Sequence, residues 1–216
     1  MVAYLRSQYD GGILYTDDVL RGFFEELDAL GLLSDTTVVV TSDHGEEFME
    51  HGRLYHIQVY SPTLKVPLLL LHPEIDRSVR VEALVESIDI APTLLQIAGL
   101  SFGGDISGES LLGYLGAAET PRSTEAYSQN WNGRVRSIYR RDDKGFHHVV
   151  LKQGKLFRKI EAFEKDDQRG LADGTRAKRL AGRLAVYRRD VVAEPNVGSL
   201  SPEHAARLKG LGYLQD

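Results

Sequence analysis

The stretch Thr37-Val38-Val39-Val40-Thr41-Ser42-Asp43-His44-Gly45-Glu46-Glu47 decides the fold of this chain. Its β-branched half, Thr37–Ser42, predicts a buried strand of a mostly parallel sheet. Asp43, His44 and Gly45 follow directly, so we expect them at the carboxyl end of that strand, where open α/β sheets bind ligands. A carboxylate oxygen and an imidazole nitrogen on adjacent residues can face one cation, with Gly45 bending the backbone beside them.

Each of these polar residues also has a plain interpretation. Asp-His-Gly after a strand can be an ordinary turn. His51 and His56 follow in an irregular stretch, where they either enrich the site or belong to a solvated loop. Lys65 precedes the apolar run Leu68–Leu71, a second predicted strand, and can be an exposed lysine at its entrance.

The elements around this centre predict an α/β domain. Apolar residues recur at helical spacing over Ile13–Leu30, which indicates an amphipathic helix that covers a sheet face and stops at Gly31. Alternation over Val79–Ser87 predicts a half-buried strand or the approach to one. Asp89 then suits the N-cap of a helix that runs to Gly99, and capping alone accounts for it.

The chain changes character after Ala117. Short strand-like runs at Thr124–Ser128, Val135–Tyr139, Phe146–Leu151 and Leu156–Ala162 alternate with turn signals and predict an antiparallel meander. A polar helix is expected over Asp173–Arg189. We therefore expect two parts, residues 1–117 and residues 118–216.

Composition excludes several function classes. The 216 residues are 42% hydrophobic and carry a net charge of −5, which does not suggest a nucleic-acid surface. No apolar run approaches the roughly 20 residues of a membrane span. The chain has no cysteine, so it contains no disulfide, no thiolate metal ligand and no cysteine nucleophile.

Several motifs in this order resemble the sulfatase family of the alkaline phosphatase superfamily. They are Val39–Glu46, Glu50-His51-Gly52, Lys65–Leu69, Asp89–Leu95 with Ala98-Gly99-Leu100, and Gly108–Leu112. The resemblance covers Tyr9 to Leu115 and extends more loosely to the ending Leu200–Leu214. It implies an α/β fold: part of an alkaline-phosphatase-like mixed sheet flanked by helices, with a small antiparallel C-terminal subdomain.

The resemblance also implies a chemistry. Sulfatases use a formylglycine nucleophile and a divalent cation, here calcium or, since His44 supplies nitrogen, manganese or zinc. Asp43 and His44 match a pair of the family's metal ligands. His56 lies near the histidine that assists the leaving group, and Lys65 matches a position that is often basic, which makes it a substrate-binding candidate.

This sequence also departs from the family pattern. It contains neither a Cys/Ser-x-Pro-x-Arg nucleophile motif nor the early Asp-Asp metal pair. We therefore expect the second half of the catalytic domain, with the nucleophile-bearing half upstream and apolar surfaces that promote self-association.

Three functions stay open: part of a sulfate ester hydrolase, part of a phosphodiester or phosphonate hydrolase, or a non-catalytic interaction module. The expected substrate of either hydrolase is a sulfate or phosphate ester of a small molecule or glycan.

Overall fold

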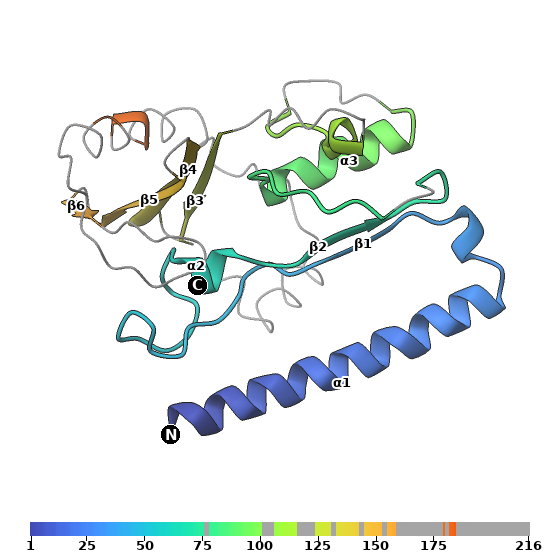
Figure 1. Cartoon of the computed structure of the whole chain (residues 1–216), viewed down its shortest axis with the longest axis horizontal. Coiled ribbons are helices and arrows are strands. Elements are labelled where there is room, and N and C mark those ends of the chain that lie inside the picture. The colour runs from blue at the N-terminus through green and yellow to red at the C-terminus, as the bar shows by residue number, and fades with distance from the viewer. Residues whose placement is uncertain are drawn as a thin grey trace, which may run out of the picture.

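Helix α1 (Val2–Ala29) is longer than the predicted helix and lies apart from most of the chain (Figure 1). The structure is a computed structural model that describes residues 1–75, 78–100, 106–115, 124–130, 133–142, 145–152, 155–158, 179 and 182–184. The chain leaves α1 through Gly31, whose φ of 69° is left-handed, so the predicted stop is confirmed.

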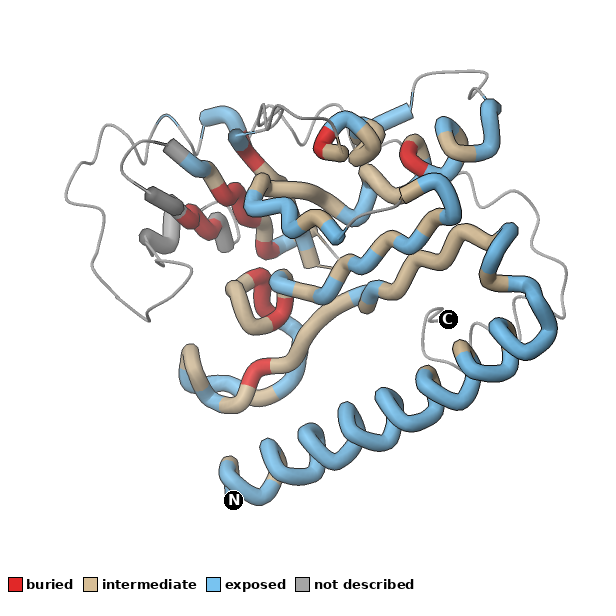
Figure 2. The backbone as a smooth tube through the Cα atoms, turned by 45° about the vertical axis from the view of Figure 1, so that its right-hand side comes forward, coloured by how far each residue is buried: buried red, intermediate tan, exposed pale blue. Residues whose placement is uncertain are grey.

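The sequence predicts that this helix covers one face of a sheet. In the part of the chain that the structure describes, this prediction is wrong. None of the residues of α1 is buried, and Figure 2 colours nearly all of the helix as exposed. Its contacts lie near its N-terminal end, where Arg6 pairs with Glu50 at 2.6 Å and Tyr9 meets the Phe48 ring edge to face at 5.2 Å. Its apolar stripe is therefore exposed or at most half-buried. Within the described residues, no helix combines the length and hydropathy needed to cross a membrane.

Strand β1 (Val38–Thr41) forms where the β-branched run predicts a strand, but it is half-buried and its partner is antiparallel. After the 3-10 turn η1 (Leu33–Asp35), β1 pairs with β2 (Leu68–Leu71) in the register Val39↔Leu70. A parallel pair needs a crossover, usually a full helix. The chain between these strands holds only the short helix α2 (Ser61–Leu64), and it reverses direction instead.

The segment before α3 also differs from its prediction. Residues 78–86 form no strand, because no segment among the residues that the structure describes pairs with them. The chain enters the 3-10 turn η2 (Ser87–Asp89) and then α3 (Ile90–Ile97), which leads to Gly99 with a φ of 65°. Asp89 does mark the start of α3, but its carboxylate accepts from the backbone N–H groups of Glu86 and Glu109, each at 2.8 Å.

The predicted meander is confirmed as a four-stranded antiparallel sheet. Strands β3 (Glu125–Gln129), β4 (Val135–Asp142), β5 (Gly145–Lys152) and β6 (Lys155–Arg158) pair in sequence order. Most of the helix predicted over Asp173–Arg189, and all of the ending at Leu200–Leu214, lie outside the described residues.

The buried core lies on this sheet and reaches back toward the Asp-His segment. Ile138 and Val149 are fully buried in its two central strands. Val135 and Val150 pack with Val59, and Tyr60 joins them. The chain that follows His56 is therefore anchored on the C-terminal sheet. The 3-10 turn η3 (Leu111–Leu115) docks separately on α3 through a 2.9 Å bond from the backbone N–H of Leu111 to Thr93.

Candidate functional site

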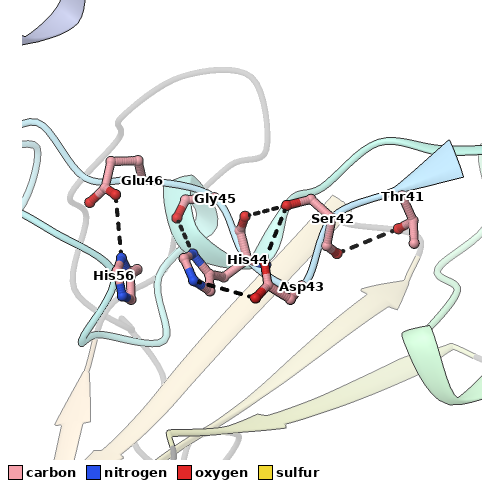
Figure 3. Close-up of polar contacts among 7 residues, drawn as sticks. All are labelled: Thr41, Ser42, Asp43, His44, Gly45, Glu46 and His56. Carbon is pink, nitrogen blue, oxygen red and sulfur yellow. Dashed lines mark hydrogen bonds and ion pairs between the residues drawn. The ribbon is translucent and has the colours of Figure 1, made fainter. Parts of the chain in front are cut away.

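Asp43 and His44 lie immediately after β1, where the sequence places them (Figure 3). The turn is fixed by side chains: Ser42 Oγ donates to the His44 carbonyl at 2.7 Å, and the His44 N–H donates to Asp43 Oδ1 at 2.9 Å. Both site side chains remain accessible, at 63% for Asp43 and 41% for His44. The plain interpretation as a turn therefore describes the local structure, and the turn presents a carboxylate and an imidazole to solvent.

Gly45 is required for a different reason from the expected one. Its φ is not left-handed, so no special bend depends on it. Its backbone instead lies against the start of α2, where the Gly45 N–H donates to the Thr63 carbonyl at 2.8 Å. A Cβ added here would lie under 3.0 Å from the Pro62 carbonyl oxygen and 3.2 Å from its carbon. Close approach of two backbones explains the glycine.

The hydrogen bonds of His44 determine which of its ring nitrogens is available. Nδ1 lies 2.9 Å from the Gly45 carbonyl oxygen, which can only accept, so Nδ1 carries the proton. A neutral His44 then offers the Nε2 lone pair, and a backbone carbonyl that orients a ring in this way is a common arrangement behind metal-binding histidines. Nε2 lies 3.7 Å from Asp43 Oδ2.

This donor pair fits one divalent cation. Two ligands about 2.4 Å from a cation and at right angles to one another lie about 3.4 Å apart, close to the observed separation. The described residues contain no group of three or more His, Cys, Asp or Glu side chains placed to bind one metal ion. Asp43 and His44 therefore offer two donors, and a stable metal site needs further ligands.

His56 is brought to the same place by the loop that follows. Its ring stacks on that of His44, with centroids 3.8 Å apart and an interplanar angle of 22° (Figure 3). Its Nδ1 donates to Glu46 Oε2 at 3.3 Å, which leaves Nε2 to exchange a proton with a ligand. The ring is about half exposed, at 48%.

Lys65 lies at the C-terminal end of α2 and is exposed, as its plain interpretation expects. It lines the same groove as Asp43, His44 and His56. That groove measures about 2050 Å³, more than twice the volume of an ordinary ligand site, so it does not define one substrate pocket. The roles of these four residues stay predictions.

Sequence reasoning missed two carboxylates next to the Asp-His pair. Glu46 binds the ring of His56, and Glu47 is wholly buried and ion-paired with His51. The pair with His51 could have been suspected, because a buried histidine four residues from a glutamate is a common partnership. The pairing of Glu46 with His56, ten residues later, depends on how the loop folds back, which no local pattern indicates.

A second polar cluster joins β3 to the segment before α3. Glu86 accepts from the Tyr127 N–H at 2.7 Å, and burial raises the pKa of Glu86, with Asp89 adding repulsion. Tyr127 donates its hydroxyl to Glu125 at 2.8 Å. Burial and that carboxylate raise the pKa of Tyr127 to about 12. These contacts are structural, since Glu125 is itself paired with Arg183 at 2.9 Å.

The sulfatase family profile matches residues 3–100, which contain the Asp-His pair, His56 and Lys65. Residues 3–100, a little under half of the chain, are thus similar to the sulfatase family. Arylsulfatase K of Bos taurus is 41% identical over 108 residues, which cover 50% of this chain and 20% of that protein. The chain thus spans about a fifth of the length of the curated sulfatases that it matches.

Solved structures support the fold assignment. A phosphonate monoester hydrolase from Silicibacter pomeroyi superposes with a TM-score of 0.65 at 24% identity and covers 87% of this chain, which covers 42% of that one. A protein solved with its substrate D-glucosamine-2-N,6-O-disulfate gives 0.56 at 20% identity, with coverages of 82% and 39%. The expected α/β fold, which these hydrolases share, is therefore confirmed.

Proposed function

We propose that this chain forms part of a sulfate ester hydrolase and that Asp43 and His44 are two of the ligands of its divalent cation. One observation carries the proposal: the carboxylate and the Nε2 lone pair lie 3.7 Å apart at the end of β1, inside the segment that matches the sulfatase family. The relatives named arylsulfatase K support sulfate esters as the substrate class.

The residues around the pair suit distinct tasks in ester hydrolysis. When bound, a divalent cation would draw charge from the oxygens of the ester. His56, with Nδ1 directed to Glu46, would give a proton from Nε2 to the departing oxygen. Lys65 would add a positive charge for the sulfate group from the same groove.

The donor types also favour certain cations. Calcium prefers sites made only of oxygen, while the nitrogen of His44 suits manganese or zinc. We propose manganese or zinc ahead of calcium. Competitive loading of a complete enzyme followed by metal analysis tests this order, and calcium alone in the loaded protein would reverse it.

A phosphonate or phosphodiester hydrolase is the second candidate, because the Silicibacter pomeroyi phosphonate monoester hydrolase covers most of this chain. Its identity of 24% supports the fold alone, whereas arylsulfatase K is 41% identical in Bos taurus and 40% identical in Mus musculus at the matched residues. Sulfate esters are therefore the first choice. The proposal also includes self-association, since apolar side chains of α1 are exposed.

The direct test is cation binding by the purified chain, followed by Mn²⁺ electron paramagnetic resonance. We expect weak binding that Asp43→Asn and His44→Gln each reduce at least tenfold, because the first removes the charge of the carboxylate and the second removes the imidazole nitrogen. Asp35→Asn, an exposed carboxylate before β1, is the matched control and should leave binding unchanged. Equal binding by all four proteins would refute the metal role and favour a non-catalytic module.

Turnover is tested with an aryl sulfate and an aryl phosphonate ester. We expect none from this chain alone, because it lacks cysteine and any Ser-x-Pro-x-Arg motif that could yield the family's nucleophile. With a nucleophile-bearing sulfatase segment supplied in trans, hydrolysis of the sulfate that needs both Asp43 and His44 would support the proposal. Faster cleavage of the phosphonate would favour the second candidate.

A further inference from the structure

The loop between Glu46 and His56 folds back on itself. Phe48 and Leu54 form an isolated antiparallel bridge, the Met49 N–H donates to the Arg53 carbonyl at 2.8 Å, and the Tyr55 N–H donates to the Glu47 carbonyl at 3.2 Å. These hydrogen bonds bring Tyr55 back beside Glu47. His56 consequently lies beside Glu46 and against the ring of His44.

This return uses backbone conformations that ordinary residues avoid. Met49 and Tyr55 both have a φ of 73°, in the left-handed region. Such residues persist only where the surrounding structure determines their conformation, and they cluster at functional sites. Tyr55 directly precedes His56 and its side chain is exposed, so its own packing does not fix the turn. Besides the backbone hydrogen bonds, a side-chain contact of another residue must therefore hold this loop in place.

The buried contact inside this loop is the ion pair of Glu47 with His51. The two side chains are 0% and 4% exposed, and His51 Nδ1 bonds Glu47 Oε1. A face of the same imidazole stacks on the ring of Tyr60, with centroids 4.0 Å apart and an interplanar angle of 22°. Tyr60 in turn packs on the core of the C-terminal sheet.

His51 therefore contacts the chain on both sides of His56. Glu47, which it bonds, follows Glu46, the residue whose carboxylate accepts from His56. Tyr60, on which it stacks, lies four residues after His56. We propose that His51 is a positioning residue that holds the His56 ring against His44. Its effect on hydrolysis rests on the proposed function, while its effect on the two rings does not.

The test reads the rings directly, without metal or substrate. The full chain is labelled with ¹³C-histidine, and the ring protons of His44 and His56 are identified from the signals lost in His44→Gln and His56→Gln. Stacked rings shift one another's proton resonances, so each of these variants should also move the signals of the remaining partner.

Three variants separate positioning from packing. His51→Phe keeps a ring for Tyr60 but removes the donor to Glu47, and it should move the His44 and His56 ring signals toward those of unstacked histidines. Glu47→Gln keeps an acceptor oxygen and should move them less. Arg53→Ala, an exposed residue of the same loop, should leave them in place.

A folded His51→Phe protein with unchanged ring signals would overturn the proposal. If His51→Phe does not fold, Glu47→Leu with His51→Leu removes the buried pair without stranding a charge. That double variant should fold and lose the stacked signals. Loss of the folded spectrum in both would make His51 a residue of general stability, and it would equally overturn the proposal.

A second measurement links the proposal to function. If Asp43 and His44 bind the cation, His51→Phe should weaken Mn²⁺ affinity by about 10-fold, the low end of the usual loss when an outer-shell partner of a ligand is removed, because the His56 ring that it positions stacks on His44. If the chain binds no cation at all, the proposed function fails, while the ring signals still decide whether His51 positions His56. A failure of the proposed function can therefore be distinguished from a failure of the positioning role of His51.

Discussion

Replacing Gly45 with alanine should destabilise the site segment strongly. The new methyl group would meet the Pro62 carbonyl oxygen, which would have to retreat by roughly 1 Å to reach ordinary contact. Overpacking of this kind costs about 1–3 kcal/mol. The retreat also lengthens the bond from the Gly45 N–H to the Thr63 carbonyl, which is worth about 1 kcal/mol. The total is about 2–4 kcal/mol.

Thermal unfolding followed by circular dichroism measures this effect. For a chain of this size, the loss corresponds to a fall in Tm of about 5–15 °C. Gly22→Ala is the matched control, because nothing lies within 4 Å of a Cβ at Gly22. Alanine is the better helix former there and should raise the helix content slightly. A Gly45→Ala protein that melts within about 1 °C of the parent would refute the close-approach argument.

Three further results are expected. Burial raises the pKa of Glu86 in the folded protein, so the stability that Glu86 contributes is fully present below about pH 4.5 and is lost as the pH rises through its pKa in the folded state. Urea unfolding across pH 4–8 should show this loss of stability, and Glu86→Gln should flatten the pH dependence. Absorbance titration at high pH should find one tyrosine that ionises near pH 12, missing from Tyr127→Phe. Gel filtration with light scattering should show self-association that Phe23→Glu on α1 reduces, whereas a monodisperse monomer would contradict it.

Local signals in the sequence predicted the elements whose ends have a chemical cause. Gly31 and Gly99 adopt the left-handed conformation that terminates a helix, and a glycine marks these positions without any tertiary information. The turn signals between short apolar runs likewise predicted the meander, because consecutive strands joined by tight turns must pair with one another.

The errors arose where an element depends on a distant partner. The β-branched composition of Val38–Thr41 records that a strand forms, but the direction of its neighbour depends on the path of the chain between residues 42 and 67. Alternation over Val79–Ser87 indicates one apolar face, but none of the described strands pairs with this segment, so it does not form a strand. The apolar stripe of α1 likewise gave no information about what lies next to it.

The candidate site likewise combines features that are local in the sequence with features that depend on distant residues. Asp43 and His44 are adjacent, so their proximity required only a strand that ends before them, and the sequence was sufficient. His56 is 12 residues from His44, and its ring meets that of His44 only because the loop reverses at Met49 and Tyr55. The proximity of the two proposed cation ligands is therefore a local property of the chain. The histidine proposed to carry the proton depends on a loop whose geometry we attribute to the buried pair of Glu47 and His51.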